Sequence, residues 1–596
     1  MARIYLDRLS QSNPALPAAG LTRRRMLRVV VGAGFGLAAL ELLAACSAPA
    51  AAPTTAPAPT TAPAPTAAPA PAPTTAPAPT TAPAPTTAPA PTTAPAATTA
   101  PAPTTAAAAA GAPKKGGTLT LGTSQTITTL DPAKPGLLND RSPWVGLWSA
   151  LVKFSPKMEV MPDLAESWEV TPDGMVYTFK LRKGVKFHNG RDLTADDVKF
   201  TLDRIADPQT ASVFAGRSLP ELDKVEVIDP STVKLTNKHP YAPQLDGLVA
   251  CKIIAKENVA DLNTNPIGTG PFQFVENVQD DHLTLKRFPG YFNADQTYLD
   301  QFTMKIVKDP TALQQALLAG QVDMIWQLPA RDADQVQNNQ NMTIITPAVE
   351  SFVGWLMYDM AQPPFNDKKA RQAANFATDR KSIVDVAFFG RYRQHDANTP
   401  LAQSHWAFNS GVKGYTYDLK KAKDLFDAAG VQSGSTITYQ CLTTANPEWV
   451  TIGEIFQQSY QEIGLNVDIK KYDLSAWLDV FVPPDKKTWP ARIITNGITA
   501  GPDPALVLTY FLTGVPSNYQ HFANDQVNEL LTKGRQTLDR DNRKAIYGQI
   551  QTIFDDDPPG IFPYFQPFMY GTYKYVQNFY AESGGEPHWE NSWLNK

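Results

Sequence analysis

Residues 435–442 read STITYQCL, residues 447–463 read PEWVTIGEIFQQSYQEI, and residues 465–471 read LNVDIKK. The first and third segments alternate polar and apolar residues, which predicts two β-strands. The middle segment has apolar residues at helical spacing, and Gly464 follows it as a helix stop. Two strands joined by a helix in one sheet pair in parallel through a right-handed crossover. The stretch therefore predicts an α/β unit.

Upstream of this unit, the local patterns predict further strands. Gly117–Ser124 alternates as a single strand. Met175–Leu181 with Val185–His188, and Val225–Ile228 with Thr232–Leu235, are each separated by a short turn and indicate two hairpins. Local strand pairs in the first half and a crossover in the second half favour at least two α/β lobes.

Three helix starts are marked by capping residues. Thr194 stands three residues before Asp197 in a capping box. Asp309 precedes Pro310, and a cap followed by a proline at the first helical position is typical of a helix N-terminus. Asp418 precedes a helix with an apolar face that ends at Gly430.

Charge and composition exclude several classes of function. The 596-residue chain has a net charge of −4, and residues 1–46 contribute +4, so the remainder carries −8. An acidic body repels phosphate backbones, which argues against a nucleic-acid partner. The three cysteines form no Cys-x-x-Cys pair and no His-Glu-x-x-His motif is present, so we expect no metal site and no cofactor.

The first 46 residues have the order of an export signal. Thr22–Arg28 contains Arg23 and Arg24 and resembles the twin-arginine signal, and 17 mostly apolar residues, Val29–Ala45, follow. The run ends in Leu43-Ala44-Ala45-Cys46, which resembles the bacterial lipobox and implies a lipidated Cys46. The alternative is an uncleaved anchor with an ordinary cysteine. Both place the body outside the cytoplasm, periplasmic or on the cell surface.

Residues 47–113 repeat alanine, proline and threonine. This segment holds 19 of the 53 prolines and no charged residue. Such a composition cannot build a core, and its prolines favour extended polyproline II. At about 3.1 Å per residue the segment spans at most roughly 200 Å. We therefore expect a disordered linker between the membrane anchor and the body.

Five segments of the body carry motifs in a fixed order. They are Leu164–Val198 (LAESWEV to LTADDV), Asn265–Phe272 (NPIGTGPF), Ala316–Asp323, Pro364–Arg380 and Ala422–Gly430. The set resembles family 5 extracellular solute-binding proteins, the peptide- and nickel-type receptors of ABC transporters. Taken singly, these motifs have structural interpretations: Gly268-Thr269-Gly270 lacks the ending of a phosphate loop and indicates a tight turn before a buried strand.

The resemblance implies an α/β fold of the two-lobed periplasmic-binding-protein type, with a hinge and a ligand cleft between the lobes. Lobe 1 would comprise residues 114–350 and 560–596, and lobe 2 residues 351–559. The implied function is an extracytoplasmic receptor that captures a peptide or peptide-like solute and delivers it to an ABC permease and ATPase complex. We expect a monomer with no catalytic residue.

The resemblance also implies where ligand contacts arise: the end of the first strand, the lobe crossing and loops of the second lobe. The candidates there are Ser124, Gln125, Trp355, Tyr358, Asp359, Trp406, Asn496 and Asp503. The aromatic candidates could equally be core residues, and Asp503 could be a helix cap. Peptide-binding members hold the ligand's amino group with an aspartate where this chain has Ala500, which weakens a free-amino peptide as ligand.

Two other classes remain open from the sequence. Ser231-Thr232-Val233-Lys234 matches the Ser-x-x-Lys of penicillin-binding proteins, but its partner motifs are missing and it falls in a predicted strand. A secreted hydrolase is therefore disfavoured. A stalked surface adhesion protein would explain the linker but not the ordered motifs.

Overall fold

The structure is a computed structural model that describes residues 112–596, apart from 135–137, 213, 351, 444–446, 474–475, 478–479, 481–490, 500 and 516. The predicted signal segment, most of the linker, Cys46 and Ala500 therefore lie outside the described residues.

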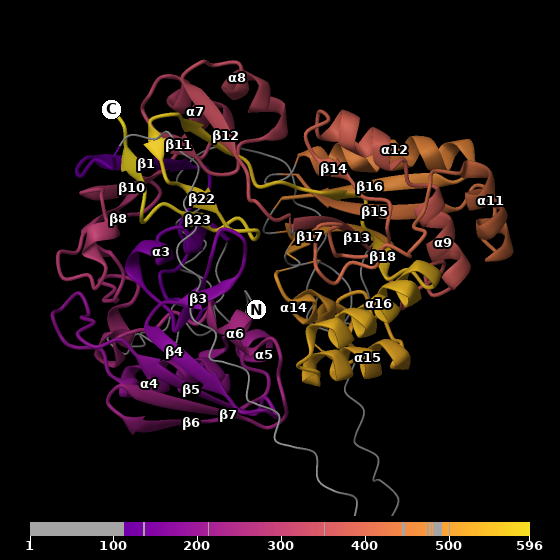
Figure 1. The fold of residues 1–596 in the computed structure, drawn as a ribbon. Helices are drawn as coiled ribbons and strands as arrows, with labels where there is room; N and C mark the ends of the chain where they lie inside the picture. Colours follow the sequence, from indigo (N-terminus) through magenta and orange to yellow (C-terminus); the bar gives the residue numbers. More distant parts are fainter. Residues whose placement is uncertain are drawn as a thin grey trace, which may run out of the picture. The chain divides into compact units, whose positions relative to one another are not determined.

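The first lobe is built on a seven-stranded sheet (Figure 1). Its strands, in spatial order, are β12 (Met342–Ile345), β20 (Tyr570–Tyr573), β11 (Met324–Ile325), β1 (Thr118–Thr123), β10 (Gln301–Ile306), β9 (His282–Arg287) and β8 (Phe272–Val278). The central strand β1 confirms the predicted strand and pairs in parallel with both neighbours, β10 and β11. The helices α7 (Pro310–Leu318) and α8 (Ala333–Gln337) belong to this lobe, and Asp309 caps α7 as predicted.

A four-stranded antiparallel sheet completes the first lobe, in the order β4 (Ala165–Val170), β5 (Val176–Leu181), β7 (Thr232–Asn237) and β6 (Leu222–Asp229). The capping box at Thr194 starts α4 (Ala195–Ala206), as predicted. The β6–β7 hairpin is also confirmed. The hairpin predicted for 175–188 is wrong, because β5 pairs with β4 on one edge and β7 on the other, which leaves no free edge for Val185–His188.

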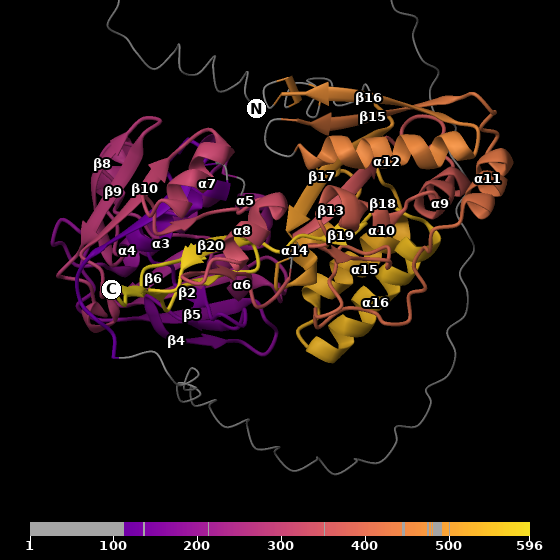
Figure 2. The same cartoon turned by 90° about the horizontal axis from the view of Figure 1, so that it is seen from above.

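The second lobe contains the other large sheet. Its path runs through β14 (Arg393–Gln394), β19 (Tyr564–Phe565), β13 (Phe352–Tyr358), β17 (Ile493–Thr499), β15 (Thr436–Leu442) and β16 (Asn466–Tyr472), and β18 (Gly560–Ile561) pairs with β13. The strands β15 and β16 pair in parallel across α12 (Glu448–Glu462), which confirms the predicted crossover. In Figure 2, α12 runs alongside these strands.

Further helices belong to the second lobe. They are α9 (Lys368–Phe376), α11 (Leu419–Ala428), α14 (Pro504–Leu508), α15 (Asp525–Gln536) and α16 (Arg540–Asp556). Asp418 caps α11 through the backbone N–H of Lys421, as the sequence predicted.

The remaining described elements are short. They are η1 (Leu138–Arg141), α3 (Trp144–Leu147), β2 (Val152–Phe154), β3 (Val160–Pro162), η2 (Pro208–Thr210), α5 (Ala215–Ser218), α6 (Gln244–Leu248), η3 (Lys256–Asp261), η4 (Ala294–Gln296), η5 (Ala330–Asp332), α10 (Arg380–Ser382), η6 (Ile383–Ala387), η7 (Thr509–Phe511), β21 (Val576–Gln577), β22 (Tyr580–Ala581), β23 (Pro587–His588) and β24 (Trp593–Leu594).

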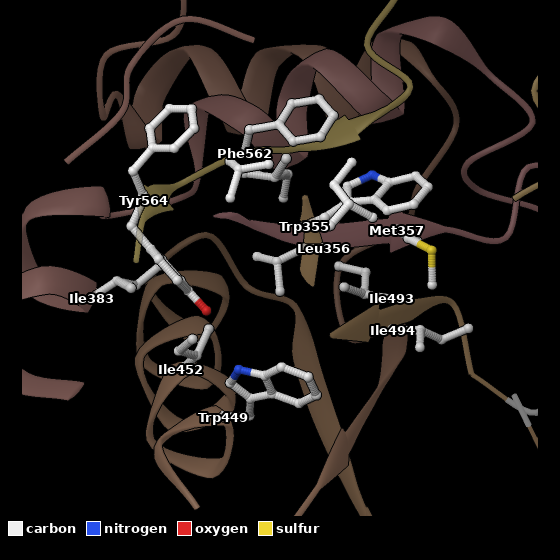
Figure 3. Close-up of a cluster of buried hydrophobic side chains, with 14 of the residues drawn as sticks. Trp355, Leu356, Met357, Ile383, Trp449, Ile452, Ile493, Ile494, Phe562 and Tyr564 are labelled. Atoms are coloured by element: carbon white, nitrogen blue, oxygen red, sulfur yellow. The ribbon is translucent and has the colours of Figure 1, made fainter. Parts of the chain in front are cut away.

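The chain passes between the two large sheets twice, and this makes the fold two-lobed. The first passage joins β12 to β13, and the second joins β19 to β20. A buried apolar cluster fills the second lobe around Trp355 and Ile493, with Phe562 and Tyr564 of the returning segment packed into it (Figure 3). The same cluster continues into the first lobe through Leu317 of α7 and Val336 of α8, and a second cluster fills the rest of the first lobe.

Two features are absent from the described part of the chain, a helix that could cross a membrane and a cluster that could hold a metal ion. No helix there has the length and hydropathy to cross a membrane. No group of three or more acidic, histidine or cysteine side chains there is arranged to hold a metal ion. Cys251 and Cys441 are free and buried.

Candidate functional site

A cavity of about 540 Å³ receives side chains from both lobes. The first lobe contributes residues of the β2–β3 turn, one residue of α6 and Val349 next to the crossing to the second lobe, and the second lobe contributes three loop or helix segments. The lining residues are Lys157, Met158, Glu159, Val160 and Asp246, then Val349, Ser404, His405, Trp406, Pro502, Asp503, Leu538, Arg540 and Arg543. A depression of about 430 Å³ beside Pro363 and Thr436 is lined by the second lobe alone. A cavity between lobes suits ligand capture, because a ligand there contacts both moving parts.

Trp406 is the large aromatic of this cavity, and its orientation is fixed. Its indole N–H donates to the carbonyl oxygen of Pro502 at 2.9 Å. The guanidinium of Arg540 lies 4.8 Å from the ring centroid, within cation–π range. The side chain is only partly buried, so a rigid aromatic surface remains available to a ligand.

His405 secures the same carbonyl. Its Nε2 lies 3.1 Å from the Pro502 oxygen, and its Nδ1 accepts from the backbone N–H of Ala407 at 3.1 Å. These partners require the neutral tautomer with the proton on Nε2. Burial lowers the pKa of His405 to about 4, so the ring stays neutral near pH 7. The two loops that bear Trp406 and Pro502 are thereby joined.

Asp503 has a structural role at the cavity wall. One carboxylate oxygen accepts from the backbone N–H of Ala505 and caps α14, which is the alternative role that the sequence analysis named for this residue. The other oxygen pairs with Arg543 at 2.5 Å, and both side chains are buried. Arg543 also donates to Tyr547 and to the carbonyl of Gly534. The Asp503 charge is therefore already balanced without a ligand.

Asp246 faces this ion pair from the first lobe. Burial, reinforced by the negative charge of Asp503, raises the pKa of Asp246 to about 7, while the charge of Arg543 acts in the opposite direction. The carboxyl group thus changes its charge near neutral pH at a point where the lobes meet. A direct hydrogen bond, from the N–H of Ala242 to the carbonyl of Arg535 at 2.8 Å, also joins the lobes here.

Three sequence candidates lie in the core of the second lobe instead. Trp355 is fully buried, with its ring against Tyr510 and Phe562. Tyr358 is fully buried and donates to the carbonyl of Arg371. Asp359 is fully buried and pairs with Arg492 at 3.3 Å. Trp355 and Tyr358 are thus core residues, the alternative that the sequence analysis named for the aromatic candidates. None of the three residues lines the cavity.

The remaining three candidates, Ser124, Gln125 and Asn496, do not line the cavity. Ser124 and Gln125 follow β1 and are partly buried, and the carbonyl of Gln125 accepts from the Asn139 side chain at 2.9 Å. Asn496 is partly buried in β17, where it stands opposite Trp355 in the strand register.

The first lobe also contains a cluster of charged side chains that the sequence analysis did not predict. It brings together Arg141, Arg217 and Lys252 with Glu582, Glu586, His588 and Glu590. The imidazole of His588 lies 2.8 Å from Glu582 and 2.9 Å from Glu590. The sequence signal was the spacing of three glutamates around one histidine near the C-terminus, but nothing local connects that segment with residues 141–252.

Comparisons with known proteins all find solute-binding proteins. The family model described as "Bacterial extracellular solute-binding proteins, family 5 Middle" matches residues 159–519. The dipeptide-binding protein of Escherichia coli K12 is 29% identical over 482 residues, which cover 75% of this chain and 89% of that protein.

Solved structures agree with this match. The ABC transporter-associated periplasmic binding protein DppA from Helicobacter pylori, in complex with the peptide STSA, is 25% identical with a TM-score of 0.72, over 81% of this chain and 99% of that one. The PBP AgaA from A. tumefacien R10, in complex with agropinic acid, is 26% identical with a TM-score of 0.71, over 80% and 99%.

Proposed function

Because this chain belongs to the family 5 bacterial extracellular solute-binding proteins, we propose that it captures a peptide or peptide-like solute in the cavity between its lobes. The protein is an extracytoplasmic solute-binding component of an ABC importer and not an enzyme. Relatives that bind a dipeptide, the peptide STSA and agropinic acid support a small, peptide-like solute.

The proposed ligand site rests on one observation: the wall of the cavity is formed by residues of both lobes. Lys157–Val160 and Asp246 face Ser404–Trp406 and Asp503 across it. The boundary expected from the sequence, with residues 560–596 in lobe 1 and 351–559 in lobe 2, falls too early, because β18 and β19 pair with strands of the second sheet. In this proposal lobe 1 comprises residues 114–350 and the segment from β20 to residue 596, lobe 2 comprises residues 351–565, and the two passages between them form the hinge. A solute that touches both lobes binds the closed form better and shifts the equilibrium toward it by that difference.

Trp406 is the proposed contact with the solute, since its ring is held rigidly and remains partly exposed. Ser124, Gln125 and Asn496 are proposed as further contacts on the two faces that approach one another. Asp503 would act indirectly, because it holds the loop of Pro502 in place through the cap and the Arg543 ion pair.

A binding assay tests this function. Thermal-shift screening with peptides, N-acylated peptides, oligosaccharides and metal chelates should yield a solute that raises the melting temperature and reduces the radius of gyration. Trp406→Ala should weaken that solute at least about tenfold by calorimetry, as loss of a rigid aromatic contact does. The control Trp168→Phe alters a tryptophan outside the cavity and should bind normally. A panel without a single binder, or full affinity in Trp406→Ala, would contradict the proposal.

Anchoring is a separate proposal. Residues Thr22–Cys46 support export through a twin-arginine signal and lipidation of Cys46, after which the monomeric body would stand off the membrane on the linker. Replacing Arg23 and Arg24 with lysine should stop delivery to the membrane. Cys46→Ala should release or misprocess the protein, and a Cys46→Ala protein that is processed and anchored normally would refute lipidation.

A further inference from the structure

Two guanidinium groups lie over one indole ring in the wall of the cavity. The guanidinium carbon of Arg540 is 4.8 Å from the centroid of the Trp406 ring, and that of Arg543 is 5.5 Å from it. All three residues line the cavity. The two arginines stand three positions apart at the start of α16, so they share one face of the helix. The ring therefore meets two cations at one place in the wall.

The protein neutralises only one of these two cations. Arg543 is buried, pairs with Asp503 at 2.5 Å, and donates to the Tyr547 hydroxyl and the Gly534 carbonyl, both at 3.1 Å. Arg540 is exposed, and among the residues that the structure describes its guanidinium has no hydrogen bond and no ion pair. The N–H donors of Arg540 are therefore free to meet a ligand.

Helix stability does not explain an arginine at position 540. Helix α16 begins at Arg540, with Asp539 as its N-cap. The N-terminus of a helix carries a partial positive charge, so a cation in the first turn is unfavourable there. Arg543 adds a second positive charge one turn further on. A partner that enters the cavity accounts for this arginine better than the local structure does.

The acidic side chains of the cavity do not serve as that partner. Asp503 is committed to Arg543 and to the cap of α14. Asp246 and Glu159 of the first lobe line the cavity, but in the described part of the chain neither forms an ion pair with Arg540. Burial and the charge of Asp503 raise the pKa of Asp246 to about 7, so protonation removes a charge that would oppose an incoming anion. The wall can therefore accept an anionic group beside Arg540.

Apolar side chains line the same cavity. Met158 and Val160 come from the β2–β3 turn and the start of β3, Val349 lies next to the lobe crossing, and Leu538 precedes α16. Leu538 is 42% exposed, although it reaches across to the first lobe, where a Cβ built on Gly174 would lie 2.6 Å from its Cδ2. Both lobes therefore offer hydrocarbon surface to a molecule that meets Arg540.

A guanidinium presents its N–H donors in a planar fork that matches the two oxygens of a carboxylate. Contact with the indole limits the motion of the Arg540 side chain before a ligand arrives, which lowers the entropic cost of binding. We propose that Arg540, held against Trp406, is the receptor for a carboxylate of the captured solute. The apolar side chains of the wall receive a neighbouring hydrocarbon group. The inference rests on the proposed function and narrows it to a peptide-like solute with a free carboxyl group beside an apolar side chain.

Two matched probes test the carboxylate on the full-length protein. N-acetyl-alanyl-leucine carries one carboxylate, and its C-terminal amide has the same side chains without the charge. Calorimetry should show that the acid binds at least about tenfold more tightly than the amide, because only the acid forms a charge-assisted hydrogen bond. Equal affinities for the two probes would overturn the inference, while the proposed function would stand.

Variants of α16 identify the residue that meets the carboxylate. Arg540→Gln should weaken the acid at least about tenfold and leave the amide unchanged, because it removes a charge that only the acid uses. Arg540→Lys should restore part of the affinity, since it keeps the charge but loses the fork. Lys544→Gln removes the same charge from an exposed position of α16 outside the cavity, and this matched control should bind both probes normally. An equal loss for acid and amide in Arg540→Gln would show that Arg540 only shapes the cavity and would overturn the inference.

The ligand-free melting temperature separates a receptor from a structural residue. Arg540→Gln should leave it unchanged or raise it, because the arginine has no ion pair and opposes the helix dipole; a clear fall would overturn the inference. For any solute of the thermal-shift panel that binds in place of the two probes, unchanged affinity in Arg540→Gln would overturn the inference alone. If no probe and no panel solute binds, the proposed function fails and this inference fails with it.

Discussion

Gly268 lies so close to the backbone of Leu147 that an added Cβ would be 1.9 Å from the Leu147 carbonyl oxygen. The Gly268 N–H donates to Nδ1 of His188 at 3.1 Å, and its carbonyl accepts from the His188 N–H at 2.9 Å. The Gly-Thr-Gly-Pro-Phe motif therefore holds backbone against backbone inside the first lobe. Its glycines serve the fold, as the sequence analysis inferred, and contact no ligand cavity.

Gly268→Ala should destabilise the protein by more than about 3 kcal/mol, because the backbone of Leu147 cannot move away as a flexible side chain would. Urea unfolding followed by tryptophan fluorescence would measure the change. Gly216→Ala is the matched control, since an added Cβ there meets nothing within 4 Å and should alter stability by less than about 1 kcal/mol. Equal midpoints for the two variants would contradict the packing role.

The sequence predicted the local units well because their signals are local. The β15–α12–β16 crossover and the caps at Thr194, Asp309 and Asp418 depend on residues within a few positions of one another. The hairpin at 175–188 failed for the opposite reason. The edges of β5 are taken by β4 and β7, and the N–H of His188 is bonded to Gly268, 80 residues away. Such long-range competition leaves no local pattern.

The site was harder to predict than the fold. Trp406 could be placed near a pocket by resemblance, whereas Trp355 and Tyr358 have the same residue character but are fully buried. Exposure decides between these roles, and it depends on the tertiary structure. Arg141 and Glu586 come together only because β20 returns the C-terminal segment to the first sheet.

His588 should stabilise the folded protein through its two glutamate partners. Burial alone would lower its pKa, but Glu590 and Glu582 raise the pKa of His588 to about 10. An unfolded histidine has a pKa of about 6.5, so the stabilisation is complete below about pH 6.5 and is lost as the pH rises toward 10. Urea midpoints should fall over this range in the wild type and change less in His588→Gln.

The same substitution should lower stability at pH 6 by a few kcal/mol, on the order of 2 to 4, because it leaves two carboxylates without their shared cation. His239→Gln is the control, since His239 is exposed and pairs with a single glutamate, Glu221. A wild-type protein whose stability does not vary between pH 6.5 and 10 would show that the His588 cluster is not charged as described.

Asp246 should make the stability of the folded protein depend on pH as well, in a lower pH range than His588 does. Its folded pKa of about 7 exceeds the value of about 4 for an unfolded aspartate, so the folded state binds more protons between pH 4 and 7. Stability should therefore fall as the pH rises through that range, by about 1.4 kcal/mol for each pH unit and up to about 4 kcal/mol in all. Asp246→Asn should remove this decline, and Asp223→Asn, an exposed control, should retain it. An unchanged pH profile in Asp246→Asn would contradict the assignment.

Cys251 and Cys441 should both remain thiols that react only after unfolding. They are free and almost wholly inaccessible, and burial raises the pKa of Cys251 to about 12 and that of Cys441 to about 11. The thiolate is the reactive form, so both low accessibility and raised pKa suppress labelling of the native protein. In the Cys46→Ala variant, a thiol reagent at pH 8 should detect none under native conditions and two in guanidinium chloride. A denatured count of zero would reveal a disulfide between residues of different lobes, which would prevent hinge motion and contradict ligand capture by closure.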